Sequence, residues 1–438
     1  MLSVFRRTDK EKIALLLLFS ILTFVQLWVA RSLQFVPVAD AGSIFSGAVG
    51  LATTGELPNP EYFARFGNQW GLLIFISAFF WVGQVFTQNF FMIYAGVLTL
   101  LINIGLYALY DLVKTRFNKR VAFIILAIVL LFPKIYFFPS KIYTDAASVA
   151  MPIIALNLFY RMRAEESKKW VLFAVLTGVV LALGAAFKPT VAIMFIAMGM
   201  LSWIYKAHVR LYKGLLIAGI VMAILLSANM LSRNLALGDE MLERHQAPWF
   251  QWFVMGLKEE DLENNMWIGT NTEPFYSRTV HMEVRAEREA FIRSELVRLV
   301  DEKETMGDWA RLFVKKYIVL HYRGDFAPGC TIVFSEDDSG LKAWFGDIRF
   351  SAPYVAYNRV ILYSIIFLAY ISIFFKRRDW VASLALFGVY FFFVFLSEVS
   401  PRQLSNYLFI FFYLSSISID GILRKLGWNG QQNVREPL

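Results

Sequence analysis

The sequence has little charge and almost no cysteine. Only 18% of its 438 residues are charged and 58% are hydrophobic, whereas soluble domains carry about 25% charged residues. A soluble chain of this composition would have more apolar surface than it could bury. The single cysteine, Cys330, excludes an intramolecular disulfide. These shortages argue against an ordinary soluble domain and against a disulfide scaffold, and they favour a protein dissolved in a lipid bilayer.

Long apolar runs are what the sequence has in abundance, and its mean hydropathy is +0.53. The runs are continuous rather than alternating, which predicts helices, because a chain in lipid must satisfy its own backbone. The first run follows basic residues but lacks a cleavage site of small residues, so we expect it to remain as a signal anchor. The candidate spans cover 12–31, 70–87, 89–111, 121–138, 145–160, 170–187, 189–205, 213–232, 357–375, 380–397 and 405–422.

Clusters of basic residues between the runs predict the topology. They occur at 6–12, 114–120, 161–169, 206–213, 376–378 and 424–425. All of them fall on the cytoplasmic side if the run at 70–87 lies in the outer interface instead of crossing. We therefore expect an all-α polytopic protein with about ten transmembrane helices and an outer interfacial helix. Both termini would be cytoplasmic. The net charge of +9 is explained by these clusters, so nucleic acid is not an expected partner.

Two outward connections are too long to be simple loops, and they divide the chain. The expected parts are a transmembrane module at 1–232 with a long first outer loop at 32–70, an outer loop domain at 233–356, C-terminal transmembrane helices at 357–425, and a cytoplasmic tail at 426–438. The loop domain is expected to be mostly helical. Its segment 282–300 is typical of a charged amphipathic helix, and 309–322 alternates apolar and basic faces, as in a helix on a membrane surface.

Two acidic residues are the main candidates for chemistry, because the spans themselves are almost free of charge. Asp40, in FVPVADAGSIFSGA, would begin a short helix at about 40–54, and Asp145, in FPSKIYTDAAS, stands where the chain re-enters the membrane. Each is explained equally well as a helix N-cap. Their shared place at the outer face favours a second interpretation, a general base close to a hydroxyl in a shielded site.

Three cations are expected at the same face: Arg402, Lys188 and Arg65. Each alone is explained more simply by snorkelling to lipid headgroups. Together they would suit a substrate with a phosphate head and a lipid tail. Near these groups in the sequence lie Tyr62, Tyr143 and Tyr407, which are candidate contacts for a sugar or an acceptor.

An aromatic run opens the large loop in the sequence HQAPWFQWF. A membrane-interface belt explains it best, and a stacking platform for a sugar or acceptor is the alternative, with His245 and Trp249 as candidate contacts. The acidic stretch Glu336, Asp337 and Asp338 lacks the spacing of a calcium-binding EF-hand loop, so a solvated turn is the better interpretation. No metal site is predicted there.

The order of these features resembles the GT-C glycosyltransferases, in particular the branch of protein O-mannosyltransferases and lipid A aminoarabinose transferases. Asp40 matches the catalytic acid of that family's first loop, and Asp145, in Tyr-Thr-Asp, matches its second-loop acid. Arg402 resembles the arginine of an Arg-Tyr-Leu-Phe type motif that contacts the carrier phosphate. This chain differs in placing four residues between Arg402 and Tyr407.

The resemblance implies a membrane enzyme that moves a sugar, hexose or pentose, from a polyprenyl-phosphate carrier to an acceptor outside the cytoplasm. The acceptor would be a cell-surface glycan, a lipid or a protein, and the reaction an inverting displacement. The resemblance identifies no particular cofactor. A divalent metal is compatible with the chemistry but unsupported, because Ala41 stands where many relatives carry a second acid.

Two other functions fit the same pattern. One is a flippase or transporter of a lipid-linked glycan, and the other is a polymerase or ligase of cell-surface glycans. The absence of an inverted repeat in the hydropathy disfavours the transporter. The HQAPWFQWFVMGL segment resembles segments of membrane proteins from Gram-positive bacteria, so a bacterial cytoplasmic membrane is the expected location.

Overall fold

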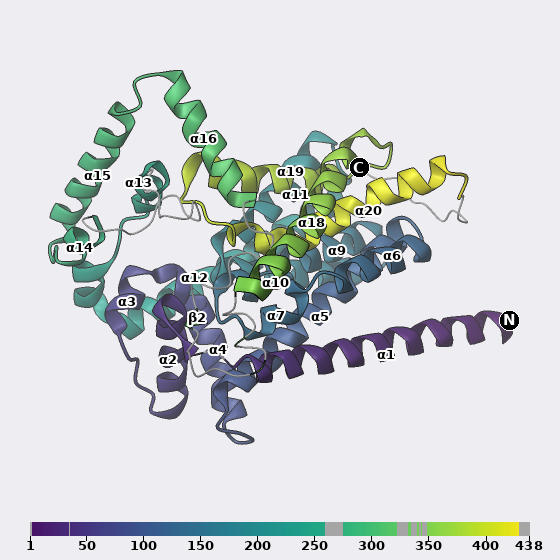
Figure 1. The fold of residues 1–438 in the computed structure, drawn as a ribbon, viewed down its shortest axis with the longest axis horizontal. Coiled ribbons are helices and arrows are strands. Elements are labelled where there is room, and N and C mark those ends of the chain that lie inside the picture. The colour runs from purple at the N-terminus through teal and green to yellow at the C-terminus, as the bar shows by residue number, and fades with distance from the viewer. Residues whose placement is uncertain are drawn as a thin grey trace.

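The structure is a computed structural model, and it describes residues 2–34, 36–258, 275–321, 332–333, 340, 343 and 348–428. The chain is a helical bundle with a helical arm that projects at the left of Figure 1. The helices before the large loop are α1 (Leu2–Ser32), α2 (Ala39–Thr53), α3 (Pro60–Arg65), α4 (Trp70–Gly83), α5 (Phe90–Arg116), α6 (Lys119–Leu130), α7 (Lys134–Phe137), α8 (Thr144–Ala147), α9 (Met151–Ala164), α10 (Lys169–Phe187), α11 (Ala192–Ile204) and α12 (Val209–His245).

The large loop and the C-terminal part are also mainly helical. They contain α13 (Gln251–Leu257), α14 (Phe275–Val280), α15 (Arg285–Asp301), α16 (Met306–His321), α18 (Ile348–Ile371), α19 (Trp380–Phe391) and α20 (Leu408–Lys425). Short turns of other helix types are η1 (Gly67–Gln69), η2 (Phe138–Ser140), η3 (Pro189–Val191), η5 (Ser372–Phe374), η6 (Phe392–Leu396) and η7 (Gln403–Tyr407). Within the described residues, the strands are β1 (Val36–Pro37) and β2 (Ile332–Val333), which pair antiparallel and join the first loop to the large one.

Among the residues that the structure describes, six helices are long and apolar enough to cross a bilayer. They are Lys10–Ser32, Phe90–Arg116, Lys169–Phe187, Val209–His245, Ser351–Phe374 and Gln403–Lys425. The pair Lys119–Leu130 and Lys134–Ser140, bent by 66° at Pro133, makes a seventh if it forms one span. The protein is therefore an integral multi-pass membrane protein, as the sequence predicts. The count of ten spans stays a prediction, since Pro189–Ile204 and Trp380–Leu396 are apolar but shorter.

The run predicted at 145–160 is not one continuous helix. The short helix α8 ends at Ala147, and α9 begins only at Met151, with Pro152 in its first turn. Proline lacks an N–H and favours the first turn of a helix, which explains why a new helix starts here. The break leaves Tyr143 to Ala147 as a separate turn at the end of the bundle.

Polar contacts gather all the basic clusters at one end of the bundle. Lys114 of α5 pairs with Glu11 of α1 at 2.5 Å, which joins the first two clusters. The other clusters are joined by Arg116 to Asp379 at 3.7 Å, Arg161 to Asp111 at 2.7 Å, Arg210 to the Glu165 carbonyl at 3.1 Å, Arg377 to Asp420 at 3.6 Å, and Arg424 to Asp420 at 2.7 Å. The clusters that the sequence assigned to one side of the membrane thus lie together.

Helix α12 holds the first outer loop in place. Arg233 donates to the carbonyl oxygens of Phe63 at 3.2 Å and of Ala64 at 2.6 Å. Trp70 donates from its indole N–H to the Ser232 hydroxyl at 3.0 Å. Since α12 runs on to His245 through a kink at Gly238 (φ 73°), the domain boundary expected at 232 falls inside this helix.

The described part of the large loop is helical, as predicted. The segment expected as an amphipathic helix at 282–300 is α15, and the one expected at 309–322 is α16. Arg288 of α15 donates to main-chain carbonyls at the end of α12, including those of Arg244 at 2.6 Å and Gln246 at 3.0 Å. Its guanidinium thereby satisfies carbonyl groups that a helix leaves without partners at its C-terminus. Cys330 and the acidic stretch at 336–338 lie outside the described residues.

Candidate active site

A cavity of about 660 Å³ lies where the first outer loop, the turn before α9 and the segment before α20 meet. Both candidate acids line it. The lining residues are Ala39, Asp40, Ser43, Asn59, Tyr62, Phe66, Asn68, Gln69, Tyr143, Thr144, Asp145, Phe187, Lys188, Pro189, Thr190, Trp252, Met255, Phe392, Phe393, Ser397, Glu398, Arg402 and Gln403. The site is thus assembled from segments that are far apart in the sequence.

Asp40 lies in the first turn of α2 and is half-buried. It does not cap that helix: the N-cap is Val38, which makes no side-chain capping bond. The Tyr143 hydroxyl donates to Asp40 Oδ2 at 2.8 Å. Ala39, just before it, has a left-handed backbone (φ 49°), which costs a residue with a Cβ about 1–2 kcal/mol. The N-cap interpretation of Asp40 is therefore wrong, and its carboxylate belongs to the cavity.

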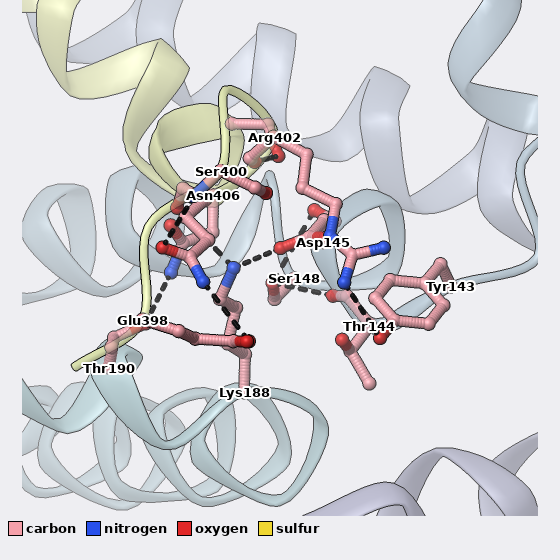
Figure 2. Close-up of polar contacts among 12 residues, drawn as sticks. Tyr143, Thr144, Asp145, Ser148, Lys188, Thr190, Glu398, Ser400, Arg402 and Asn406 are labelled. Carbon is pink, nitrogen blue, oxygen red and sulfur yellow. Dashed lines mark hydrogen bonds and ion pairs between the residues drawn. The ribbon is translucent and has the colours of Figure 1, made fainter. Parts of the chain in front are cut away.

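Asp145 also does not cap a helix, because the N-cap of α8 is Tyr143 and no side chain bonds to the first turn. Asp145 is 1% exposed and forms ion pairs with Lys188 and with Arg402, whose Nε lies 3.6 Å from Oδ2. Figure 2 shows the two cations approaching the carboxylate from different parts of the chain. Burial raises the pKa of the Asp145 carboxyl, but Lys188 and Arg402 outweigh it, so the pKa lies below its usual value.

Tyr143 connects the two acids through Arg402. Arg402 donates to the Tyr143 hydroxyl at 3.3 Å, and its guanidinium carbon lies 4.5 Å from the centre of the tyrosine ring. Burial raises the pKa of Tyr143 well above its usual value, so the hydroxyl stays protonated and donates to Asp40. The polar chain therefore runs from Asp40 through Tyr143 and Arg402 to Asp145 and Lys188.

Lys188 is held at the tight turn between α10 and η3. Besides its ion pair with Asp145, its ammonium group donates to the Gln403 carbonyl at 3.3 Å. Pro189 follows directly and fixes the backbone of the turn. The Gln403 side chain donates to Glu398 Oε1 at 3.4 Å, which brings a third acid to the cavity wall. Both partners of Asp145 are thus positioned by neighbouring main chain and side chains.

The other predicted site residues divide into two groups. Tyr62 lines the cavity, and burial together with the charge of Asp40 raises its pKa, so its hydroxyl also stays protonated. Arg65, His245, Trp249 and Tyr407 are not among the lining residues. Arg65 donates to the Thr279 hydroxyl at 2.5 Å, and Tyr407 is fully buried and donates to the Thr190 carbonyl at 3.1 Å.

Sequence reasoning missed Gln69, Glu398 and Gln403, and within the aromatic run it chose Trp249 rather than Trp252 as the candidate contact. The aromatic run was recognised, but the tryptophan that lines the cavity is Trp252, whereas Trp249 is 73% exposed. Glu398 and Gln403 flank Arg402 in the segment SEVSPRQ, and that proximity was the available signal. Gln69 had no local signal, because its place depends on how η1 packs beside α4.

Within the described ranges, no three histidine, cysteine or acidic side chains lie close enough together to hold a metal ion. The charges on the cavity wall are instead the acids Asp40, Asp145 and Glu398 and the cations Lys188 and Arg402. The two cations can therefore bind an anion, and the acids can accept hydrogen bonds from hydroxyl groups.

Comparisons with known proteins found a similarity among solved structures but none in sequence. No protein-family model matches the chain, and no curated protein matches it. Among solved structures, its fold is similar to the crystal structure of ArnT from Cupriavidus metallidurans bound to undecaprenyl phosphate, with a TM-score of 0.44 and 10% sequence identity. The similarity covers 94% of this chain and 78% of that one.

Proposed function

We propose that this protein is a membrane glycosyltransferase that moves a sugar from a polyprenyl-phosphate carrier to an acceptor outside the cytoplasm. One observation carries the proposal. A half-buried carboxylate, Asp40, and two buried cations, Lys188 and Arg402, line the same cavity at the end of a membrane bundle. A base beside a cationic site suits the transfer of a group from a phosphate to a hydroxyl.

Asp40 serves as the general base. It accepts a hydrogen bond from Tyr143, whereas Asp145 is bound to both cations. Asp40 takes the proton from the acceptor hydroxyl while that oxygen attacks C1 of the sugar from the face opposite the phosphate. The bond from C1 to the phosphate oxygen breaks, and the electron pair leaves with the polyprenyl phosphate. The configuration at C1 is inverted.

Lys188 and Arg402 stabilise the negative charge that develops on the leaving phosphate oxygen. In the absence of the carrier, Asp145 pairs with both and offsets one of their two charges, which keeps them together at the cavity wall. Asp145 is thus a positioning residue for the phosphate site. Tyr62 and Tyr143 contribute hydroxyl donors near Asp40. Arg65, His245, Trp249 and Tyr407 are outside the cavity lining, so the proposal gives them no contact with the substrate.

The proposed topology has ten crossings, both termini in the cytoplasm and the cavity facing outward. The gathering of all basic clusters at one end supports it, because each segment between that end and the cavity end then crosses once. Helix α4 is the exception. It lies between two elements of the outer side.

The test is a donor-cleavage assay with purified protein in lipid nanodiscs. Radiolabelled undecaprenyl-phosphate hexoses and pentoses are supplied with cell-envelope glycan, lipid and peptide acceptors, and release of undecaprenyl phosphate is measured. Asp40→Asn should lower the rate by about two to four powers of ten, because it removes the base. Glu61→Gln, which changes an exposed acid on neighbouring α3, should keep the wild-type rate.

Other outcomes point to the other functions. Retained activity in Asp40→Asn would exclude Asp40 as the base. Movement of the intact lipid across a vesicle bilayer without cleavage would identify a flippase. Cleavage of lipid-diphosphate donors alone would identify a glycan polymerase or ligase.

A further inference from the structure

Two side chains on the cavity wall indicate the class of acceptor. We propose that Trp252 and Gln69 form a subsite that binds a carbohydrate, so that the hydroxyl presented to Asp40 belongs to a glycan. That the bound glycan is the acceptor rests on the proposed function. Carbohydrate binding at this subsite can be measured whether or not the protein is a transferase.

Trp252 offers an aromatic surface to the cavity. It lies on α13, whose neighbouring Gln251 and Val254 are fully buried, while Trp252 itself is partly exposed and lines the cavity. Phe66 lies beside it, with ring centroids 6.4 Å apart at 47°. The faces of aromatic rings are electron-rich and attract the weakly positive C–H groups of a sugar face. The pair therefore forms a platform on which a sugar ring can stack.

Gln69 supplies an unpaired acceptor atom. Its side chain is 5% exposed and lines the cavity, and its Oε1 has no hydrogen-bond partner in the part of the chain that the structure describes. A buried carbonyl oxygen left in this state costs folding free energy, because it has lost its hydrogen bonds to water. A ligand that binds here gains by bringing an O–H or N–H donor to that atom.

A carbohydrate accounts for both features at once. Its ring stacks on Trp252, and its hydroxyl groups donate to Gln69 Oε1. An ionised phosphate has only acceptor oxygens and would leave Gln69 unpaired, and so would a hydrocarbon tail. The amides of Asn59 and Asn68 line the same cavity, and amides both donate and accept, as hydroxyl groups do. A glycan is therefore favoured over a lipid tail, and peptide probes are included in the test because a peptide also carries donors.

The test measures binding to the full-length protein in nanodiscs by saturation-transfer NMR. The probes are maltotetraose, mannotetraose, chitotetraose and hexapeptides rich in serine and threonine. We expect at least one tetrasaccharide to bind wild-type protein, and Trp252→Ala to weaken it roughly tenfold. Trp252→Phe should restore part of the loss, and Gln69→Leu should weaken binding roughly fivefold, since it removes the acceptor at similar volume.

The matched control is Trp249→Ala, which removes an exposed tryptophan of the same aromatic run. Trp249 packs edge-on against Phe250 and Phe253 and is not a lining residue. It should bind like wild type. Equal losses in both tryptophan variants would overturn the subsite, and so would the absence of tetrasaccharide binding. Preferential binding of the peptides would overturn the carbohydrate class.

The outcome is separable from the proposed function. If saccharides bind in a Trp252-dependent way but no lipid-phosphate donor is cleaved, the transferase proposal fails and the subsite stands. If donors are cleaved but saccharides neither bind nor accept the sugar, the subsite fails and the transferase proposal stands.

Discussion

Asp145 lies buried between Lys188 and Arg402, and the three charges depend on one another. Removing one partner of a buried ion pair leaves a charge without compensation, which typically costs about 3–5 kcal/mol. Asp145→Asn should therefore lower the free energy of unfolding by about 3 kcal/mol, because it leaves Lys188 and Arg402 side by side without their shared counter-charge. The double variant Asp145→Asn with Lys188→Met should recover part of this loss, because it removes the repulsion between the two cations. The measurement is the unfolding midpoint of each variant in detergent.

A double-mutant cycle decides this prediction. If the two substitutions simply add, the charges are not coupled, and the account of Asp145 as the resident counter-charge is wrong. The conservative Lys188→Arg serves as control, since it keeps the positive charge.

The two acids show how far single site residues could be predicted from the sequence. Asp40 and Asp145 were identified because both stand at helix starts on one expected face. The capping alternative, equally consistent with the sequence, is wrong for both. What no local pattern reveals is the link through Tyr143, which joins side chains more than a hundred residues apart, 103 from Asp40 and 259 from Arg402. Such contacts depend on the packing of whole helices.

Helix α16 packs on η6 with a lysine at the interface. Phe313 and Phe395 have ring centroids 4.5 Å apart, and His321 Nε2 lies 2.7 Å from the Tyr390 hydroxyl. Lys316, on the same helix, is fully buried, and its ammonium group has no hydrogen-bond partner among the described residues. Burial lowers the pKa of Lys316 from its usual 10.5 to about 7, and the charge of Glu398 opposes this only weakly. The interface therefore disfavours a charged lysine.

This burial predicts a pH dependence of stability. The unfolded chain keeps the Lys316 proton up to about pH 10.5, whereas the folded chain releases it near pH 7. The penalty is therefore complete below pH 7 and fades as the pH rises from 7 to about 10.5. Lys316→Met should raise the melting temperature at pH 7 and reduce the gain in stability between pH 7 and 9.

The control for this prediction is Lys315→Met, on the same turn of α16 but half-exposed. It should leave the pH dependence unchanged. A pH dependence that is the same in wild type and Lys316→Met would show that the lysine is accessible to water, and would contradict the buried placement.

Elements were predicted well where the apolar pattern was long, and less well where local chemistry interrupts it. The two helices expected in the large loop are present as α15 and α16. The run at 145–160 was expected to be one span, but the structure breaks it before Met151. Hydropathy remains high through such a break, so the periodicity alone does not locate it. The proline at 152 is the signal that does.

At the scale of the whole molecule, topology can be tested by cysteine labelling in intact cells. Cys330→Ser first removes the single native cysteine. Thr54→Cys, directly after α2, and Gln88→Cys, after α4, are both at exposed positions and should react with an impermeant maleimide from outside. Lys168→Cys, exposed among the basic clusters, should react only after permeabilisation.

The position after α4 decides the count. If Gln88→Cys is labelled only in permeabilised cells, α4 crosses the membrane, and the ten-crossing topology is wrong. If Thr54→Cys is also protected, the cavity faces the cytoplasm and the proposed outward transfer fails.

The cavity is completed by residues from position 39 in the first loop to position 403 before the last helix. During synthesis the ribosome delivers these pieces in order, so Arg402 enters the membrane long after Asp40. A chain interrupted before Arg402 would hold Asp40 without the second cation. The proposed activity would therefore begin only after nearly the whole chain has been synthesised, and a shorter chain in the membrane would not catalyse the transfer.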